Sequence, residues 1–360
     1  MTRPSTKTVL LALLPTAVFG FGLALRFPER TDVLYARSLY PLVARAFAFA
    51  NRVPFSLAEP IAMLLIVFVL WSLYRLWQRR ERRWSGVFLW SWRTAGVFVA
   101  SFLVLWGFNY ARPSLAERSA LSADTVDAHA VLSAGERAAA ITSLLFDALG
   151  DERAPTVLPF TFAELNQRLD EAFARLRLPG DGIDFDPTPA KPLLSSTLFS
   201  YLGISGIFVP FTGEPSVNVL QPDVALPIVV AHEKAHQRGV THEGEANFAA
   251  FLACAQESSP AYFRYAAYLF ATRSLLTEAS LYLPRSDVDQ AWTRLGEGPT
   301  EDVRAIHAFW RRYEGPASIA ASHANDAYLR AMQVEGGVQS YGTVVQLLMA
   351  LDERGELFPQ

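Results

Sequence analysis

The sequence predicts an α+β protein that is mostly α, with three N-terminal transmembrane helices followed by a helix-rich domain with a small sheet. Three observations favour this fold class. Hydrophobic residues fill 51% of the 360 positions and charged residues only 19%, which is a low charged share for a wholly soluble protein. Long apolar runs occupy the first third of the chain. Beyond them, apolar residues recur at three- and four-residue spacing, as in amphipathic helices.

Membrane-spanning helices are expected at about residues 8–25, 58–77 and 87–110. Each run approaches the length of about 20 residues that a helix needs to cross the hydrocarbon core. The first run has an alternative interpretation as a cleaved signal peptide, because Arg3 and Lys7 precede it. No small-x-small cleavage site stands out after its apolar stretch, which favours a retained helix.

The loop between the second and third runs predicts the orientation of the membrane region. It is short and carries four arginines, Arg79, Arg80, Arg82 and Arg83. Positively charged short loops stay on the cytoplasmic side, so three crossings place the chain after Tyr110 on the outer side. The first outer loop also contains five arginines, but they are diluted over a longer segment that reads as an amphipathic helix on the membrane surface. We therefore expect a membrane region over 1–112 and an extracytoplasmic domain over 113–360.

The expected outer domain has helices on both sides of a short strand region. Residues 133–149 and 161–178 show helical apolar spacing. Residues 197–220 mix β-branched and aromatic residues with turn formers. Pro210 and Pro215 favour a hairpin or an edge strand there, because proline cannot donate to a central ladder. The pattern then returns to helices for the rest of the chain.

Charge and cysteine content exclude several classes of protein. The net charge is −3 and no basic region stands out, so no nucleic-acid partner is expected. Cys254 is the single cysteine, which excludes an internal disulfide framework and predicts a small buried apolar residue. His129, His307 and His323 lie in polar helical surroundings and are expected at the surface. The charges of residues 300–315 likewise indicate a solvated helix face.

The stretch "VVAHEKAHQRGVTHEGEANF" contains the strongest chemical motif in the chain. Asp223 and Pro227 mark the start of a helix over "VALPIVVAHEKAHQR" and Gly239 marks its end, and within it His232 and His236 lie one turn apart on the same face. This is the H-E-x-x-H arrangement, in which two imidazoles bind one Zn²⁺ ion and Glu233 acts as the general base for a water molecule. The preceding residues are apolar on all sides, so the helix is expected to be buried, where such polar groups are costly unless something binds them.

A catalytic zinc ion usually takes three protein ligands, and His242, Glu243 and Glu245 compete for the third position. The spacing in "HEKAHQRGVTH" fits H-E-x-x-H-x-x-G-x-x-H and supports His242, but that pattern also needs a methionine turn, and none is recognisable downstream. Helix geometry favours Glu245. If Thr241 caps a second helix through Gln256, Glu245 emerges from its apolar face and needs a cation. Glu243 falls on a more polar face, where solvation suffices.

Several segments resemble a family of bacterial membrane proteins, the domain-of-unknown-function 3810 family, whose motif is similar to that of gluzincin metallopeptidases. The segments are "LWGFNYARPSL", "VPFTGEPSVN", "HEKAHQRG", "EGEANFAAFLAC", "NDAYLRA" and "GGVQSYGTVVQLLM", and they extend over most of the chain. The resemblance implies a zincin-like domain whose third ligand falls in "EAN", which is Glu245. With the orientation given above, such a chain is expected in the cell inner membrane as a multi-pass protein, with its catalytic domain on the periplasmic side.

The expected function is a membrane-anchored zinc metallopeptidase. His232, His236 and Glu245 would bind Zn²⁺, and Glu233 would deprotonate a water molecule that attacks a peptide carbonyl. The expected partners are the lipid bilayer and a peptide or protein substrate, and a cell-wall peptide is a further substrate class. The alternative is a non-catalytic, membrane-tethered binding or assembly module with a structural metal site, which would need a fourth protein ligand. The oligomeric state stays open.

Three further roles are hypotheses. The segment "GIFVPFTGEPSVNV" offers an edge strand on which an extended peptide can pair, or it is an ordinary hairpin. The Tyr341 hydroxyl can donate to an oxyanion, although a tyrosine there more often only packs. Asn247 and Asn325 are candidates for orienting a metal ligand, and neither is assigned that role from the sequence.

Overall fold

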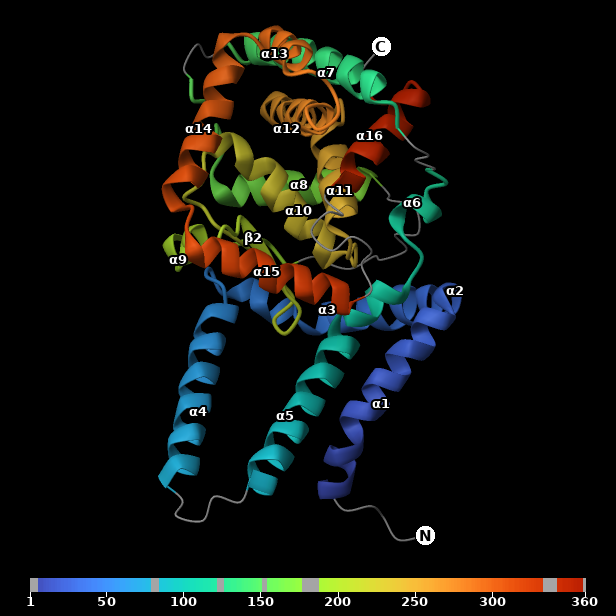
Figure 1. Cartoon of the computed structure of the whole chain (residues 1–360), viewed down its shortest axis with the longest axis vertical. Helices are drawn as coiled ribbons and strands as arrows, with labels where there is room; N and C mark the ends of the chain where they lie inside the picture. The colour runs from blue at the N-terminus through green and yellow to red at the C-terminus, as the bar shows by residue number, and fades with distance from the viewer. Residues whose placement is uncertain are drawn as a thin grey trace. The chain divides into compact units, whose positions relative to one another are not determined.

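The computed structural model describes residues 6–78, 84–121, 126–150, 154–176, 188–332 and 342–358, and Figure 1 shows their fold. The described chain divides into two compact units. The N-terminal unit contains residues 6–113, Thr188 and the short segment Val209–Glu214, and the C-terminal unit contains the others. Helices make up most of both units, and the described strands form one small sheet, so the predicted fold class, α+β and mostly α, is confirmed.

Among the described residues, three helices of the N-terminal unit are long and apolar enough to cross a membrane. They are α1 (Thr6–Arg26), α4 (Ala58–Gln78) and α5 (Trp84–Leu105). They coincide with the three predicted runs, except that the third helix stops at Leu105 because the 3₁₀-helix η3 (Gly107–Ala111) follows it. These spans are typical of a membrane-associated protein. The arginine-rich loop that predicted the orientation, residues 79–83, lies outside the described residues.

Helix α1 packs against α5, and this contact compensates for a proline inside α1 (Figure 1). Pro15 has no amide hydrogen, so the carbonyl of Leu11, one turn earlier, lacks its helical donor. The Trp92 indole of α5 donates a hydrogen bond to that carbonyl at 3.0 Å. A Cβ added to Gly96 would lie 3.1 Å from the Leu14 backbone nitrogen, so glycine permits the close approach of the helices. Both features suit a helix pair in hydrocarbon, where every backbone group needs a partner within the protein.

The segment between α1 and α4 is helical, as its amphipathic pattern predicts. It consists of α2 (Pro28–Thr31), the π-helix η1 (Asp32–Leu39), α3 (Tyr40–Ala46) and the 3₁₀-helix η2 (Ala48–Arg52). Leu34 and Leu42 are 69% and 59% exposed, which leaves an apolar face uncovered. Asp32 is buried and lies 2.7 Å from the Arg112 guanidinium, so an ion pair ties η1 to the chain after η3. The location of this segment on a membrane surface stays a prediction.

Three described strands form the sheet, in the order β1-β3-β2. They are β1 (Lys191–Pro192), β2 (Gly206–Val209) and β3 (Glu214–Val217). Strands β1 and β3 are parallel, and β2 and β3 are joined by a turn so short that they must be antiparallel. The predicted edge strand is β2. Pro215 lies in the middle strand, β3. This is possible because β1 pairs with Ser216 and Val217 and not with Pro215, so no backbone N–H is needed there for the pairing with β1.

The helices of the C-terminal unit surround an interior pair, α10 and α11 (Figure 1). The α-helices are α6 (Leu115–Arg118), α7 (Ala128–Leu149), α8 (Phe162–Leu176), α9 (Ser196–Tyr201), α10 (Leu226–Gln237), α11 (Glu243–Ala255), α12 (Ala261–Ala279), α13 (Arg285–Trp292), α14 (Glu297–Tyr313), α15 (Pro316–Ala331) and α16 (Thr343–Glu353). Two 3₁₀-helices, η4 (Asp223–Ala225) and η5 (Thr293–Leu295), precede α10 and α14. Helices α8, α12 and α16 pack on α11, and α12 packs along α7. Cys254 of α11 is fully buried, as predicted.

Candidate metal centre

The local sequence turns the chain sharply between α10 and α11. Pro227 lies in the first turn of α10, where a backbone N–H would have no helical acceptor. Gly239 follows α10 with a φ of +78°, a conformation that favours glycine. The Val240 N–H donates back to the Ala235 carbonyl at 3.1 Å, which closes the helix end. This turn brings the first residue of α11 back to the histidines of α10.

His232 and His236 of α10 meet Glu243, the first residue of α11. His232 Nε2 lies 3.0 Å from His236 Nε2 and 3.2 Å from Glu243 Oε2. His236 Nε2 lies 3.7 Å from the same carboxylate oxygen. Ligand atoms at the usual zinc bond lengths lie about 3.4 Å apart in a tetrahedral site. The three atoms therefore have the spacing of three corners of such a site.

Nδ1 of each histidine makes a hydrogen bond with an oxygen atom. His232 Nδ1 lies 2.8 Å from Asn247 Oδ1, and His236 Nδ1 lies 2.7 Å from the Val240 carbonyl oxygen. A carbonyl oxygen can only accept, so Nδ1 carries the hydrogen and Nε2 of the neutral ring carries a lone pair. Both lone pairs therefore face the Glu243 carboxylate. Three converging electron-pair donors repel one another unless they share a proton or a metal ion, and two nitrogens with one carboxylate oxygen form a donor set that suits zinc.

Burial and close charges set the protonation state of the cluster. Burial by itself lowers the pKa of His236, but the hydrogen bond and charge of Glu243 outweigh it and raise that pKa to about 9. Burial by itself raises the pKa of Glu243, but the hydrogen bonds from His232 and His236 hold that pKa far below its usual range. Without a metal ion, Glu243 is therefore ionised and His236 is protonated at neutral pH, so a metal ion would have to displace the His236 proton.

The side chain of Glu233, on α10, lies against the edge strand β2. It is 3% exposed, and a Cβ added to Gly206 would lie 2.6 Å from its Oε1, so a larger residue at 206 would collide with the carboxylate. The Phe208 backbone N–H donates to the carboxylate, while Oε2 has no hydrogen-bond partner among the described residues. Burial raises the pKa of Glu233, although the nearby His232 and His236 oppose this shift. A carboxylate with one unsatisfied buried oxygen and a raised pKa is suited to accept a proton from water.

Glu245, the third ligand predicted from the sequence, does not reach the two histidines. Its Oε1 accepts a hydrogen bond from the Ala116 backbone N–H at 3.1 Å, and its Oε2 lies 3.8 Å from His242 Nδ1. Glu245 is buried as predicted, but its carboxylate accepts a hydrogen bond from a backbone N–H and is turned toward Ala116 and His242 instead of the two histidines of α10. His242, the other alternative, also lies outside the cluster of potential metal ligands among the described residues.

The difference arises because Glu243 and Glu245 lie on different faces of α11 and meet different partners. The sequence predicts Thr241 as the cap of this helix, whereas the structure has His242 as the cap and Glu243 as the first helical residue, a shift that does not change the face of any side chain. Glu243 and Asn247 are four residues apart and share one helix face, and both lie within 3.2 Å of His232. The spacing of glutamate and asparagine in "EGEAN" is the sequence signal that points to this face.

An ion pair that sequence reasoning missed fixes the opposite side of α10. The Lys234 side chain is fully buried, and its Nζ lies 2.8 Å from Asp170 Oδ1 on α8. Burial lowers the pKa of Lys234, and the charge of Asp170 opposes the shift. The Arg238 guanidinium carbon lies 4.4 Å from the centre of the Phe173 ring, and Phe173 is on α8, as Asp170 is. Because Lys234 points away from the histidines, these contacts fix the rotation of α10 that presents His232 and His236 to α11.

Most of the chain matches one protein family. A family described as "Protein of unknown function (DUF3810)" matches residues 35–349, which include both α10 and α11. The chain belongs to the DUF3810 family. No curated protein and no solved structure matches it. Tyr341, the hypothetical oxyanion donor, falls inside the DUF3810 match but outside the residues that the structure describes.

Replacing Asn247 of this DUF3810 chain with alanine is expected to weaken zinc binding at this candidate site about 10- to 100-fold, the usual cost of losing an orienting partner of a metal-binding histidine. The His232 ring would lose the acceptor for its Nδ1 hydrogen and could rotate away from the cluster. Competition against a chromophoric chelator measures the affinity. Asn325→Ala on α15 is the matched control and should leave it unchanged, whereas equal affinities in Asn247→Ala and wild type would contradict the orienting role.

Proposed function

We propose that this chain is a membrane-anchored zinc metallopeptidase in which His232, His236 and Glu243 hold the metal ion. The observation that supports this proposal is the convergence of three ligand atoms, separated by 3.0, 3.2 and 3.7 Å, at the junction of α10 and α11. A structural zinc site generally has four protein ligands, whereas a catalytic site has three and an open position. Within the described residues, this cluster has three members, which favours the catalytic type.

Glu233 is the proposed general base. A bound zinc ion would supply Lewis-acid chemistry, polarising a carbonyl group and making a nearby water molecule more acidic. Glu233 would take the proton of the attacking water and pass it to the leaving amine nitrogen. Its buried carboxylate, with an oxygen that has no partner among the described residues, is suited to this proton transfer.

The proposed substrate is a peptide in extended conformation. Strand β2 is at the edge of the sheet, and its first residue, Gly206, lies against the Glu233 carboxylate. A peptide that adds to an edge strand gains backbone hydrogen bonds without strict demands on its sequence. The same pairing would hold one peptide bond near Glu233, which positions it for attack by water.

The proposed location is the cell inner membrane, with the C-terminal unit on the periplasmic side. The three apolar helices support membrane association. The side of the membrane follows from the arginine-rich loop at residues 79–83, which the positive-inside rule places in the cytoplasm. A domain on the outer side would have access to periplasmic or cell-wall peptides.

Zinc dependence of peptide hydrolysis tests this function. The full-length protein, purified in detergent micelles, is treated with a chelator, dialysed, and then supplied with one equivalent of zinc. We expect cleavage of a mixed library of internally quenched peptides to disappear on chelation and to return with zinc. Cleavage that persists in the metal-free protein would contradict the proposal, and so would zinc-loaded protein that cleaves no member of the library.

A further inference from the structure

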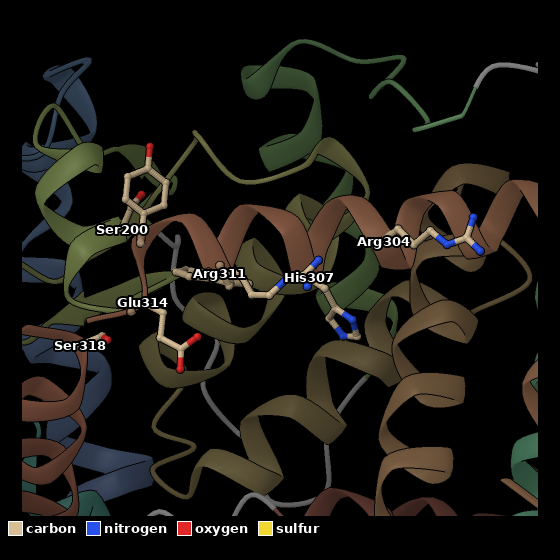
Figure 2. Close-up of a pocket in the computed structure, with 9 residues that line it drawn as sticks. Ser200, Arg304, His307, Arg311, Glu314 and Ser318 are labelled. Carbon is tan, nitrogen blue, oxygen red and sulfur yellow. The ribbon is translucent and has the colours of Figure 1, made fainter. Parts of the chain in front are cut away.

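An open cavity of about 560 Å³ lies in the C-terminal unit between α14, the end of α9 and the start of α15 (Figure 2). In Figure 2, Ser200 and Ser318 lie at one end of the cavity and Arg304 at the other, with His307 and Arg311 between them. Two aromatic rings, Trp310 and Tyr313, also line it. The sequence predicted a solvated helix face for this part of α14, and Arg304, His307 and Arg311 are exposed as predicted, but the cavity is a feature that sequence reasoning missed.

The lining of the cavity has an excess of positive charge. Arg304 pairs with Glu301 on the same helix. Arg311 and His307 make neither an ion pair nor a hydrogen bond with any residue that the structure describes. Glu314 is the single carboxylate among the lining residues, and it is not paired with Arg311.

A third arginine, which is not among the lining residues, adds to the positive potential at His307. Arg273, on α12, also has no ion pair or hydrogen bond within the described part of the chain, and burial lowers its pKa. The pKa of His307 is lowered by its partial burial and then by the charges of Arg273 and Arg311. The nearest buried carboxylate on α14, Asp302, is occupied by hydrogen bonds from Thr156 and Tyr265. An anionic group in the cavity would therefore meet the Arg311 guanidinium, which has no other partner among the described residues.

The two serine hydroxyl groups at the cavity are not available to donate to an anion. Ser200 Oγ donates to the Ser196 carbonyl at 3.0 Å, and Ser318 Oγ donates to the Gly315 carbonyl at 2.9 Å. Their hydrogens are committed to backbone oxygens, so the charged donor for an anion is the guanidinium of Arg311, with the His307 imidazole, the Trp310 indole and the Tyr313 hydroxyl as further donors. A guanidinium can bind both oxygens of a carboxylate at once, which makes a carboxylate a well-matched ligand.

The cavity is connected to the metal centre by a short stretch of chain. Gly203, which lines the cavity, lies three residues before Gly206, the residue in contact with the Glu233 carboxylate. Three residues span at most about 11 Å even when fully extended. An extended peptide rises about 3.3 Å per residue, so a peptide along β2 reaches from Glu233 to the cavity in about three residues.

We propose that this cavity receives a carboxylate of the peptide substrate, within about three residues of the cleaved bond. This inference rests on the proposed peptidase function, and it names the substrate class as acidic peptides. The carboxylate can come from an acidic side chain or from the C-terminus of the peptide. Both sources offer the same group to Arg311 and His307.

Matched peptide pairs test the inference on the full-length, zinc-loaded protein in detergent micelles. Each pair carries glutamate or glutamine at one of the three positions on either side of the cleaved bond, and a further pair ends in a free acid or an amide. We expect glutamate at one position, or the free C-terminus, to raise kcat/KM about tenfold or more, the size of effect expected for a charge-assisted hydrogen bond. Arg311→Gln should bring the ratio within each pair close to one. Arg312→Gln, the same change at the next residue, which does not line the cavity, should preserve the preference.

Two outcomes would overturn the inference. One is cleavage without any preference for a carboxylate, which would leave the peptidase function intact. The other is an equal loss of preference in Arg311→Gln and Arg312→Gln, which would show a general charge effect. If the protein cleaves no peptide, fluorescence anisotropy with a labelled acidic peptide and its glutamine counterpart decides the matter. Binding of the acidic peptide that depends on Arg311 would then support the cavity while the proposed function fails, and equal binding of both peptides would reject the cavity as well.

Discussion

Replacement of Glu233 by glutamine is expected to reduce peptide hydrolysis by about 10²- to 10⁴-fold, the usual contribution of a general base, while the protein keeps its zinc. Glutamine has nearly the shape of glutamate and can still accept the hydrogen bond from the Phe208 N–H. It cannot take a proton from water. Because Glu233 is not among the three converging ligand atoms, the metal content should not change.

The Glu233 experiment needs a matched control and a metal measurement on the same samples. Glu257→Gln makes the same chemical change at an exposed position just after α11, and it should leave the rate and the zinc content at wild-type values. Turnover of Glu233→Gln equal to wild type would eliminate Glu233 as the base. A loss of activity that is matched by an equal loss of zinc would mean that residue 233 supports the metal site instead.

Glu243→Gln is expected to weaken zinc binding by more than the roughly 100-fold upper cost of losing an orienting residue, because it removes a ligand itself. Glu243 provides the carboxylate oxygen that lies 3.2 Å and 3.7 Å from the two histidine nitrogens. A neutral amide oxygen is a weaker ligand than a carboxylate and leaves the dication with one less compensating charge. Activity at limiting zinc should fall in parallel.

Glu245→Gln is the comparison that separates the two assignments of the third ligand. The amide oxygen of glutamine can still accept from the Ala116 N–H, so the fold around α6 and α11 should be retained. Zinc affinity is expected to stay within a few-fold of wild type. The reverse pattern, a large loss of affinity in Glu245→Gln and a small one in Glu243→Gln, would restore the assignment made from the sequence.

Much of the fold follows from periodicity and from single residues. The apolar runs predicted all three long N-terminal helices, because a run of about 20 predominantly apolar residues matches the length of a helix that crosses the hydrocarbon core. Pro227 and Gly239 placed the ends of α10 within about two residues, since each has a specific backbone preference at a helix end. The hairpin of β2 and β3 was predicted from its prolines, although Pro215 is in the middle strand and not at an edge.

The candidate site was only half predictable. His232 and His236 are placed on one face by helix geometry alone, so the motif fixed their proximity. The third ligand depends on which face of α11 meets α10: Glu243 and Asn247 meet His232, whereas Glu245 meets Ala116 and His242. The predicted burial of Glu245 is confirmed, but burial does not specify the partner of a charge.

The cavity beside α14 was not predictable in the same way. Its lining combines α14 with residues from α9 and α15, which are separated by about 100 positions in the sequence. The local pattern of residues 300–315 shows only a charged, amphipathic helix. Packing between elements that are distant in the sequence decides which charged side chains of α14 line the cavity and which face solvent.

Zinc-edge anomalous diffraction from crystals of the full-length protein tests the central claim most directly. We predict one anomalous peak about 2.1 Å from His232 Nε2, His236 Nε2 and a carboxylate oxygen of Glu243, with no fourth protein ligand. A peak coordinated by Glu245, a peak with four protein ligands, or no peak at this junction in protein that contains stoichiometric zinc would contradict it.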